Sequence, residues 1–190
     1  MAGDVTLEGE NANIALEMLK NVTDLLDENN ISYWLEGGTL LGIIRENRLL
    51  PWDNDMDLSI KEEDFTKVAE VMNKLSYRVR YREFEKDDDP FVKGVTRQIK
   101  IRNYKYKFFR GDVVLEIFVK FRKDEQYFWQ VDPKKKSVPA YFYDKLAKFS
   151  FNSKEYLVPA KYKEYLTFRY GDWKAPVKEW NTFTDDKAVL

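Results

Sequence analysis

Residues 35–60 combine a double-glycine turn, a short apolar helix and three alternating aspartates, and they constrain the chain more than any other stretch. They read LEGGTLLGIIRENRLLPWDNDMDLSI. Alternate residues of an extended chain point to the same side, so Asp55 and Asp57 project together while Met56 and Leu58 face the other way. Two converging carboxylates repel each other unless a divalent cation lies between them, and hard oxygen ligands suit Mg²⁺ or Mn²⁺. The sequence therefore predicts a divalent metal site on this strand.

The glycines upstream predict a phosphate-binding turn beside the metal. Gly37 and Gly38 follow an expected strand over residues 31–35, and Thr39 is the expected N-cap of a helix that continues through Ile44. Backbone N–H groups at such a helix start can bind phosphate. Arg45 lies between the turn and the aspartates, where its guanidinium could hold a phosphate through two hydrogen bonds. Weaker candidates for the same task are Arg48, Lys100 and Arg102.

A third carboxylate is expected, because two divalent ions bring roughly four positive charges to one site. The best candidate is Glu116, which stands alone in the apolar run VVLEIF and is costly to bury unless it meets a cation. Asp112 is the alternative, although beside Gly111 it is also typical of a turn. Asp53 comes one alternation before Asp55 and is a further metal-ligand candidate, with a purely structural turn as the competing interpretation.

Composition excludes several classes of catalyst. The 190 residues contain no cysteine and no histidine, which rules out disulfides, thiolate zinc sites and every Ser-His-Asp or Cys-His arrangement. The 32 basic and 33 acidic residues nearly balance, which argues against a dedicated duplex-DNA binder. There is no apolar run long enough to span a bilayer, and the N-terminus is polar and acidic. We expect a cytoplasmic protein that makes no membrane span and binds no nucleic acid.

The pattern of apolar residues predicts an α/β (α+β) fold, with a small mixed sheet and helices against it. A single domain is expected over residues 1–190, with a catalytic core at about 31–121 and an aromatic, lysine-rich C-terminal segment at about 140–175 that contains a small helix. The two acidic strands should meet at one edge, where a cleft opens toward that helix. Helices are expected over 11–28, 62–75 and 160–170, strands over 31–35, 56–60, 77–84, 96–102 and 111–121, exposed turns over 85–90 and 133–136, and a loose tail over the last dozen residues.

The order of these motifs resembles the LicD family, which includes fukutin and fukutin-related protein, within the nucleotidyltransferase superfamily of DNA polymerase beta. The resemblance rests on four stretches and spans about residues 33–173. Two departures stand out: Glu46 replaces a common histidine, and Glu116 stands where many members have aspartate. The matching stretches are Gly38–Arg45, Pro51–Asp57, Glu116–Phe118 and Val158–Trp173.

The resemblance implies metal-dependent transfer of a phospho-alcohol, phosphocholine or a polyol phosphate, from a CDP-activated donor to a sugar or glycan hydroxyl. Asp55, Asp57 and Glu116 would be the catalytic carboxylates and would hold Mg²⁺ or Mn²⁺, with Asp53 as a further metal ligand. Two alternatives remain open: transfer of a nucleoside monophosphate from an NTP, and a catalytically dead binding module, against which the intact aspartate pair argues. The cytosine ring would stack on an aromatic side chain, for which Trp52, Tyr170 and Trp173 are the candidates.

Overall fold

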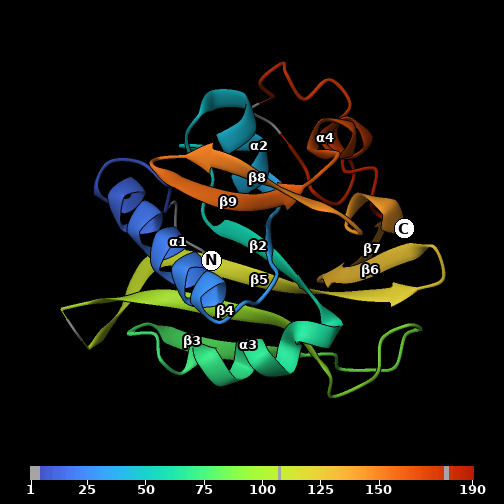
Figure 1. Ribbon diagram of the computed structural model, residues 1–190, viewed down its shortest axis with the longest axis horizontal. Helices are drawn as coiled ribbons and strands as arrows, with labels where there is room; N and C mark the ends of the chain where they lie inside the picture. The colour runs from blue at the N-terminus through green and yellow to red at the C-terminus, as the bar shows by residue number, and fades with distance from the viewer. Residues whose placement is uncertain (1–4, 107, 178–179) are drawn as a thin grey trace.

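A mixed β-sheet crosses the middle of the molecule (Figure 1). The computed structural model describes residues 5–106, 108–177 and 180–190. Strands β2 and β5 run parallel, and all the other neighbouring strands of the sheet are antiparallel. The sheet has the order β1-β2-β5-β4-β3, with β6 and β7 continuing from the end of β5, so the predicted mixed α/β class is confirmed. The strands are β1 (Trp34–Leu35), β2 (Met56–Lys61), β3 (Arg78–Glu83), β4 (Thr96–Lys105), β5 (Phe109–Lys123), β6 (Gln126–Val131) and β7 (Lys134–Pro139).

Helices α1 and α3 lie together along one face of the sheet (Figure 1). A separate hairpin, β8–β9, leads into α4 on the other side of the molecule. Within the described residues, no helix combines the length and apolar character needed to cross a membrane. The remaining elements are α1 (Glu10–Glu28), α2 (Gly37–Glu46), η1 (Glu62–Asp64), α3 (Phe65–Met72), η2 (Ala140–Phe142), β8 (Leu146–Phe151), β9 (Lys154–Pro159) and α4 (Tyr162–Tyr170).

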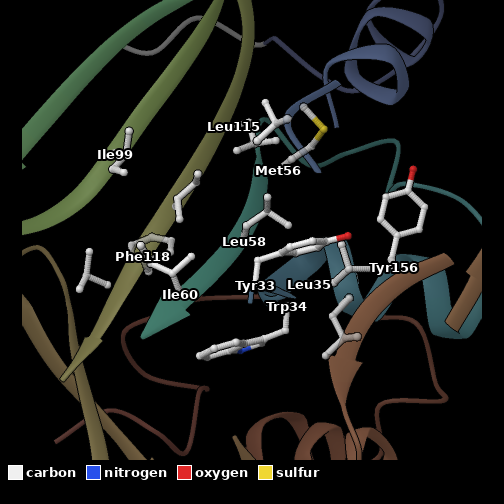
Figure 2. Packing of buried hydrophobic residues seen from close by; sticks show 14 of the residues in the cluster. Tyr33, Trp34, Leu35, Met56, Leu58, Ile60, Ile99, Leu115, Phe118 and Tyr156 are labelled. Atoms are coloured by element: carbon white, nitrogen blue, oxygen red, sulfur yellow. The ribbon is translucent and has the colours of Figure 1, made fainter. Parts of the chain in front are cut away.

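The alternation in β2 gives the sheet one apolar and one polar side. Met56, Leu58 and Ile60 are fully buried, and Figure 2 shows Met56 close to Leu115 of the neighbouring β5. Asp57 lies between these residues in the chain and therefore faces the opposite side of the sheet. Burial of the apolar side chains of β2 fixes which way the carboxylate points, because a slip of one residue would exchange the two faces.

Of two predictions for the C-terminal third, one was partly right and one was wrong. The expected exposed turn over 133–136 is confirmed only at its start, where Pro133 is exposed in a turn, because β7 begins at Lys134 and Lys136 is only 1% exposed. The tail is not loose in its described part, because Val189 pairs with Lys136 and Ser137 N–H donates to Ala188 O at 2.8 Å. Buried Asp186 anchors this tail through Lys136 Nζ at 2.7 Å. Charge and proline content suggested solvent exposure, but the lysine and the aspartate neutralise each other inside the protein.

Candidate active site

The glycine turn and the aspartate strand are joined by backbone hydrogen bonds. The helix α2 begins at Gly37, and Glu36 is its N-cap, with its carboxylate accepting from Gly37 N–H at 3.1 Å. Thr39, which we expected to be the N-cap, instead accepts a hydrogen bond from Asp57 N–H at its Oγ1, at 2.8 Å. Glu36 N–H donates to Asp57 O at 3.1 Å. Both polar groups of the Asp57 backbone are therefore fixed against the start of α2.

Two carboxylates occupy the space that the paired glycines leave open. A Cβ atom at Gly37 would overlap Oδ2 of Asp57, and a Cβ atom at Gly38 would overlap Oδ2 of Asp53. Gly37 also has a φ of 56°, in the left-handed region that glycine adopts without strain. Both glycines are thus needed for the close approach of acidic side chains to the turn. This use of the turn could not be predicted from the sequence, which indicated only a phosphate site.

The three aspartates lie half-buried beside one another, and the loss of solvent around their carboxylates raises their pKa values. Burial raises the pKa of Asp53 to about 6. Burial, together with the charges of Asp53 and Glu116, raises the pKa of Asp55 to about 7. The pKa of Asp57 lies well above its usual range, because this carboxyl is buried and faces the charges of Asp55, Asp53 and Glu116. A divalent cation would relieve this repulsion, so the chemistry of the donor set fits Mg²⁺ or Mn²⁺.

Glu116 lies directly beside Asp57, because these two residues are paired in the register of β5 with β2. It accepts hydrogen bonds from Gln98 Nε2 and from Lys100 Nζ. Asp112, the alternative third carboxylate, forms an ion pair with Lys105 instead. In the part of the chain that the structure describes, the acidic side chains do not form a ready group of three around one point.

The arginines that were phosphate-binding candidates have partners within the protein. Arg45 donates to Glu46 Oε1 from Nε at 3.0 Å and from Nη2 at 2.6 Å, and its Nη1 donates to Trp173 O at 3.3 Å. Arg48 pairs with the other oxygen of Glu46. The departure from the family pattern at Glu46 thus has a structural role, since this residue bridges two arginines. Arg45 still lines the cleft described next.

A cleft of about 520 Å³ opens above the carboxylates. It is bounded by α2, by the loop before β2 and by the segment that follows α4, as expected for a cleft facing the C-terminal helix. The stacking candidates Trp52, Tyr170 and Trp173 all line it, and Trp52 is 40% exposed. Sequence reasoning missed other residues of the wall and floor, which include Trp129, Lys136, Arg169 and Trp180.

Glu36 is the centre of a buried network beneath this cleft. Its carboxylate accepts from Tyr143 OH at 2.9 Å and from Arg169 Nη1 at 2.9 Å, and it forms an ion pair with Lys120 Nζ at 3.2 Å. Burial acts to raise the pKa of Glu36, but the charges of Lys120 and Arg169 and a hydrogen bond from Tyr165 outweigh it and hold the pKa well below its usual range. The N-cap of α2 is therefore ionised and fixed from several directions.

Lys120 is the member of this network that the sequence could have revealed. It stands alone in the apolar run IFVKF of β5, is 0% exposed and lies 3.4 Å from the centre of the Trp129 ring. The reasoning that identified Glu116, a lone charge in an apolar strand, applies equally to this lysine. Burial lowers the pKa of Lys120 to about 7, against the opposing effect of Glu36.

Comparison with known proteins identifies the group to which these features belong. The family model described as LicD/FKTN/FKRP, nucleotidyltransferase domain, matches residues 30–161. Ribitol-5-phosphate transferase FKTN of Homo sapiens is 25% identical over 174 residues, which cover 88% of this chain and 34% of that protein. Lipopolysaccharide cholinephosphotransferase LicD of Haemophilus influenzae is 34% identical over 58 residues, covering 30% of this chain and 22% of that protein. The chain thus spans about a third or less of the length of these relatives.

Solved structures support the fold. The crystal structure of lincosamide antibiotic adenylyltransferase LnuA, lincomycin-bound, superposes with a TM-score of 0.50, covering 79% of this chain and 83% of that one. The two sequences are 12% identical, so this likeness concerns the fold alone.

Proposed function

Because the chain belongs to the LicD/FKTN/FKRP family of nucleotidyltransferase domains, we propose that it transfers a phospho-alcohol from a CDP-activated donor to a sugar hydroxyl. The group transferred is phosphocholine or a polyol phosphate such as ribitol phosphate. A bond forms between the acceptor oxygen and the phosphorus that carries the alcohol. The phosphoanhydride bond to CMP breaks, CMP leaves, and the acceptor hydroxyl loses its proton.

The observation that carries the proposal is the close approach of half-buried carboxylates to a double-glycine helix start. Asp57 lies beside Glu116 on parallel strands, and the carboxylates of Asp53 and Asp57 fill the space above Gly38 and Gly37. Burying like charges together is unfavourable for folding, so the arrangement is understandable only if a cation or a substrate uses it. This argues against the catalytically dead alternative.

We assign a divalent cation, Mg²⁺ or Mn²⁺, to this cluster. Asp55, Asp57 and Glu116 would hold it, with Asp53 as the further ligand beside the turn. When bound, such an ion neutralises charge on the donor phosphates and so makes the leaving CMP more stable.

The other groups of the site bind and orient the donor phosphates, and one carboxylate accepts the proton of the acceptor hydroxyl. We assign the donor phosphate oxygens to the N–H groups of Gly38 and Thr39 in the first turn of α2, because Gly37 N–H is already bonded to the Glu36 side chain. Arg45, at the cleft wall, adds positive charge. Asp57 or Glu116 takes the proton of the acceptor hydroxyl.

Calorimetric titration tests the proposal. CDP-choline, CDP-ribitol, CTP and ATP are each titrated into the protein with Mg²⁺ and again with EDTA. The test variant is Asp55→Asn/Asp57→Asn, and the matched control is Asp112→Asn, which removes a carboxylate from the same sheet outside the cluster. We expect Mg²⁺-dependent binding of a CDP-alcohol that is lost in the double variant and kept in the control.

Other outcomes distinguish the alternatives. Preference for CTP or ATP over both CDP-alcohols would move the protein to nucleotidyl transfer. Absence of all nucleotide binding, with a double variant that is more stable but otherwise unchanged, would overturn the metal-site argument.

A further inference from the structure

The side of β3 and β4 that faces away from α3 is densely basic. Tyr81 of β3 packs edge-on against Phe65 of α3, with ring centres 6.2 Å apart, so the residues that alternate with Tyr81 point to the opposite side. Their partners on β4 share that side because they are directly paired in the register. We call this surface the basic face; it consists of Arg78, Arg80, Arg82, Lys100 and Arg102.

Two pairs of like charges stand directly opposite each other on the basic face. Arg78 is paired with Arg102, and Arg80 with Lys100. Directly opposed like charges destabilise a sheet. Burial and the charges of Arg110 and Arg78 lower the pKa of Arg102, which shows that the positive groups act on one another. The chain as a whole has a net charge of −1, so this concentration is local and not a consequence of composition.

The basic face is continuous with the carboxylate cluster. Asp57 of β2 is paired with Glu116 of β5, Glu116 with Lys100 of β4, and Lys100 with Arg80 of β3. These four side chains form one row across the sheet, two acids followed by two bases. With neighbouring strands about 4.8 Å apart, Arg80 starts about 10 Å from the strand of Glu116.

We propose that the basic face binds a phosphate group carried by the sugar acceptor, and so holds the acceptor hydroxyl beside Asp57 and Glu116. This rests on the proposed function and names its acceptor class, a phosphorylated sugar or glycan. Guanidinium groups match phosphate oxygens through paired hydrogen bonds.

The same row of four side chains separates the proposed donor site from the basic face. Its phosphates are assigned to the start of α2, which packs on β2 at Asp57. The basic face begins on the other side of Glu116, at β4. A donor phosphate at Gly38 and an acceptor phosphate at Arg80 would therefore approach the carboxylates from opposite ends of the row.

The test uses glucose 6-phosphate and glucose as matched probes, titrated in EDTA so that no divalent metal contributes. The variant is Arg78→Gln/Arg80→Gln, whose side chains are half-buried and exposed, and the control Lys67→Gln/Lys74→Gln removes two exposed charges near α3. We expect the wild type and the control to bind glucose 6-phosphate at least tenfold more tightly than glucose, and the arginine variant to lose that preference. Asp57→Asn should keep it.

The proposal is overturned if the wild type shows no preference for the phosphorylated sugar, or if the arginine variant retains it. A second titration, CDP-choline with Mg²⁺, separates the two phosphate sources. An affinity unchanged within twofold in the arginine variant supports the acceptor, whereas a tenfold loss assigns the face to the donor and overturns the proposal. If CDP-choline binds to none of the proteins while the glucose 6-phosphate preference persists, the proposed function fails and the phosphate site stands.

Discussion

Asp57 illustrates, at the scale of one residue, how backbone and side chain can have opposite effects on stability. Its N–H and C=O groups are satisfied by Thr39 and Glu36. Its carboxylate lies half-buried next to other acids, and this raises its pKa. The backbone contacts hold the carboxylate close to the neighbouring acids that repel it. Removing the carboxylate should therefore raise the stability of the fold and lower the proposed transfer activity.

Asp57→Asn should raise the free energy of unfolding in EDTA at pH 8 by about 1–2 kcal/mol, since it removes one of several half-buried acids that disfavour one another. Transfer activity should fall at least about a hundredfold. Urea unfolding and a turnover assay measure the two effects. The control is Asp112→Asn, whose ion pair with Lys105 is partly exposed and should change stability by less than about 1 kcal/mol. A destabilised Asp57→Asn protein would contradict the argument.

Thr39→Val should lower the free energy of unfolding by about 1–3 kcal/mol, because it leaves the N–H of Asp57 without its acceptor while keeping the shape of the side chain. Thr39→Ser keeps the hydroxyl and should recover most of the loss. Urea unfolding of both variants measures this contribution. Equal free energies of unfolding for Thr39→Val and Thr39→Ser would show that the hydroxyl contributes nothing.

At the scale of the element, the first turn of α2 is shaped by what packs above it. Alanine favours a helix over glycine by about 1 kcal/mol, yet a Cβ at Gly38 would overlap Asp53 Oδ2. The loop before β2 and the start of α2 are therefore sterically complementary, and a larger side chain in one of them alone should lower the stability of the fold.

Gly38→Ala should accordingly destabilise the protein and reduce the rise in melting temperature that we expect Mg²⁺ to produce if it binds at the proposed site. The double variant Gly38→Ala/Asp53→Ala removes the overlap and should be more stable in EDTA than Gly38→Ala alone. Thermal unfolding of the four proteins of this cycle gives the coupling between the two sites. Additive effects would rule out the steric account.

The elements that carry the site were largely predictable, because β2 and β5 follow clear alternation and the lone Glu116 stands out in an apolar strand. Local patterns could not reveal partners distant in the chain. Lys136 looked exposed because Asp186, which neutralises it, lies 50 residues further on. Thr39 looked like a cap because its true partner, Asp57, belongs to another element.

At the scale of the whole molecule, one buried ionic network joins elements that are far apart in the sequence. Arg169 of α4 donates to Glu36 at the start of α2 and to Asp186 of the C-terminal tail. Asp186 in turn accepts from Lys136 of β7. Removal of Asp186 leaves Lys136 buried without its ionic partner, which typically costs about 3–5 kcal/mol. The tail and the glycine turn should therefore unfold in a single transition.

Lys120 gives this network a measurable pH dependence. Its pKa is about 7 in the folded protein against a usual 10.5, so between these values the unfolded chain binds the extra proton. The contribution of Lys120 to the free energy of unfolding should rise with pH from 7 to 9, by at most about 1.4 kcal/mol per pH unit, and be flat below pH 7.

Lys120→Met should remove this rise, whereas Lys123→Met, which changes an exposed lysine of the same strand, should not. Urea unfolding at pH 7, 8 and 9 in EDTA gives the three profiles. Parallel profiles for wild type and Lys120→Met would show that the buried amine keeps its proton throughout.

The cleft has a floor, formed by Glu36 and Asp57, and a wall that contains Trp52 and Trp180, and the two should differ in how well they tolerate substitution. On the floor, the Glu36 carboxylate is held by hydrogen bonds from Tyr143 and Arg169, so a new side chain there would disturb folding before it altered selectivity. The wall contains Trp52 and Trp180, which are 40% and 36% exposed. Substitutions that change ligand selectivity should therefore accumulate in the aromatic wall, and a library built to alter that selectivity should vary those tryptophans and leave the floor intact.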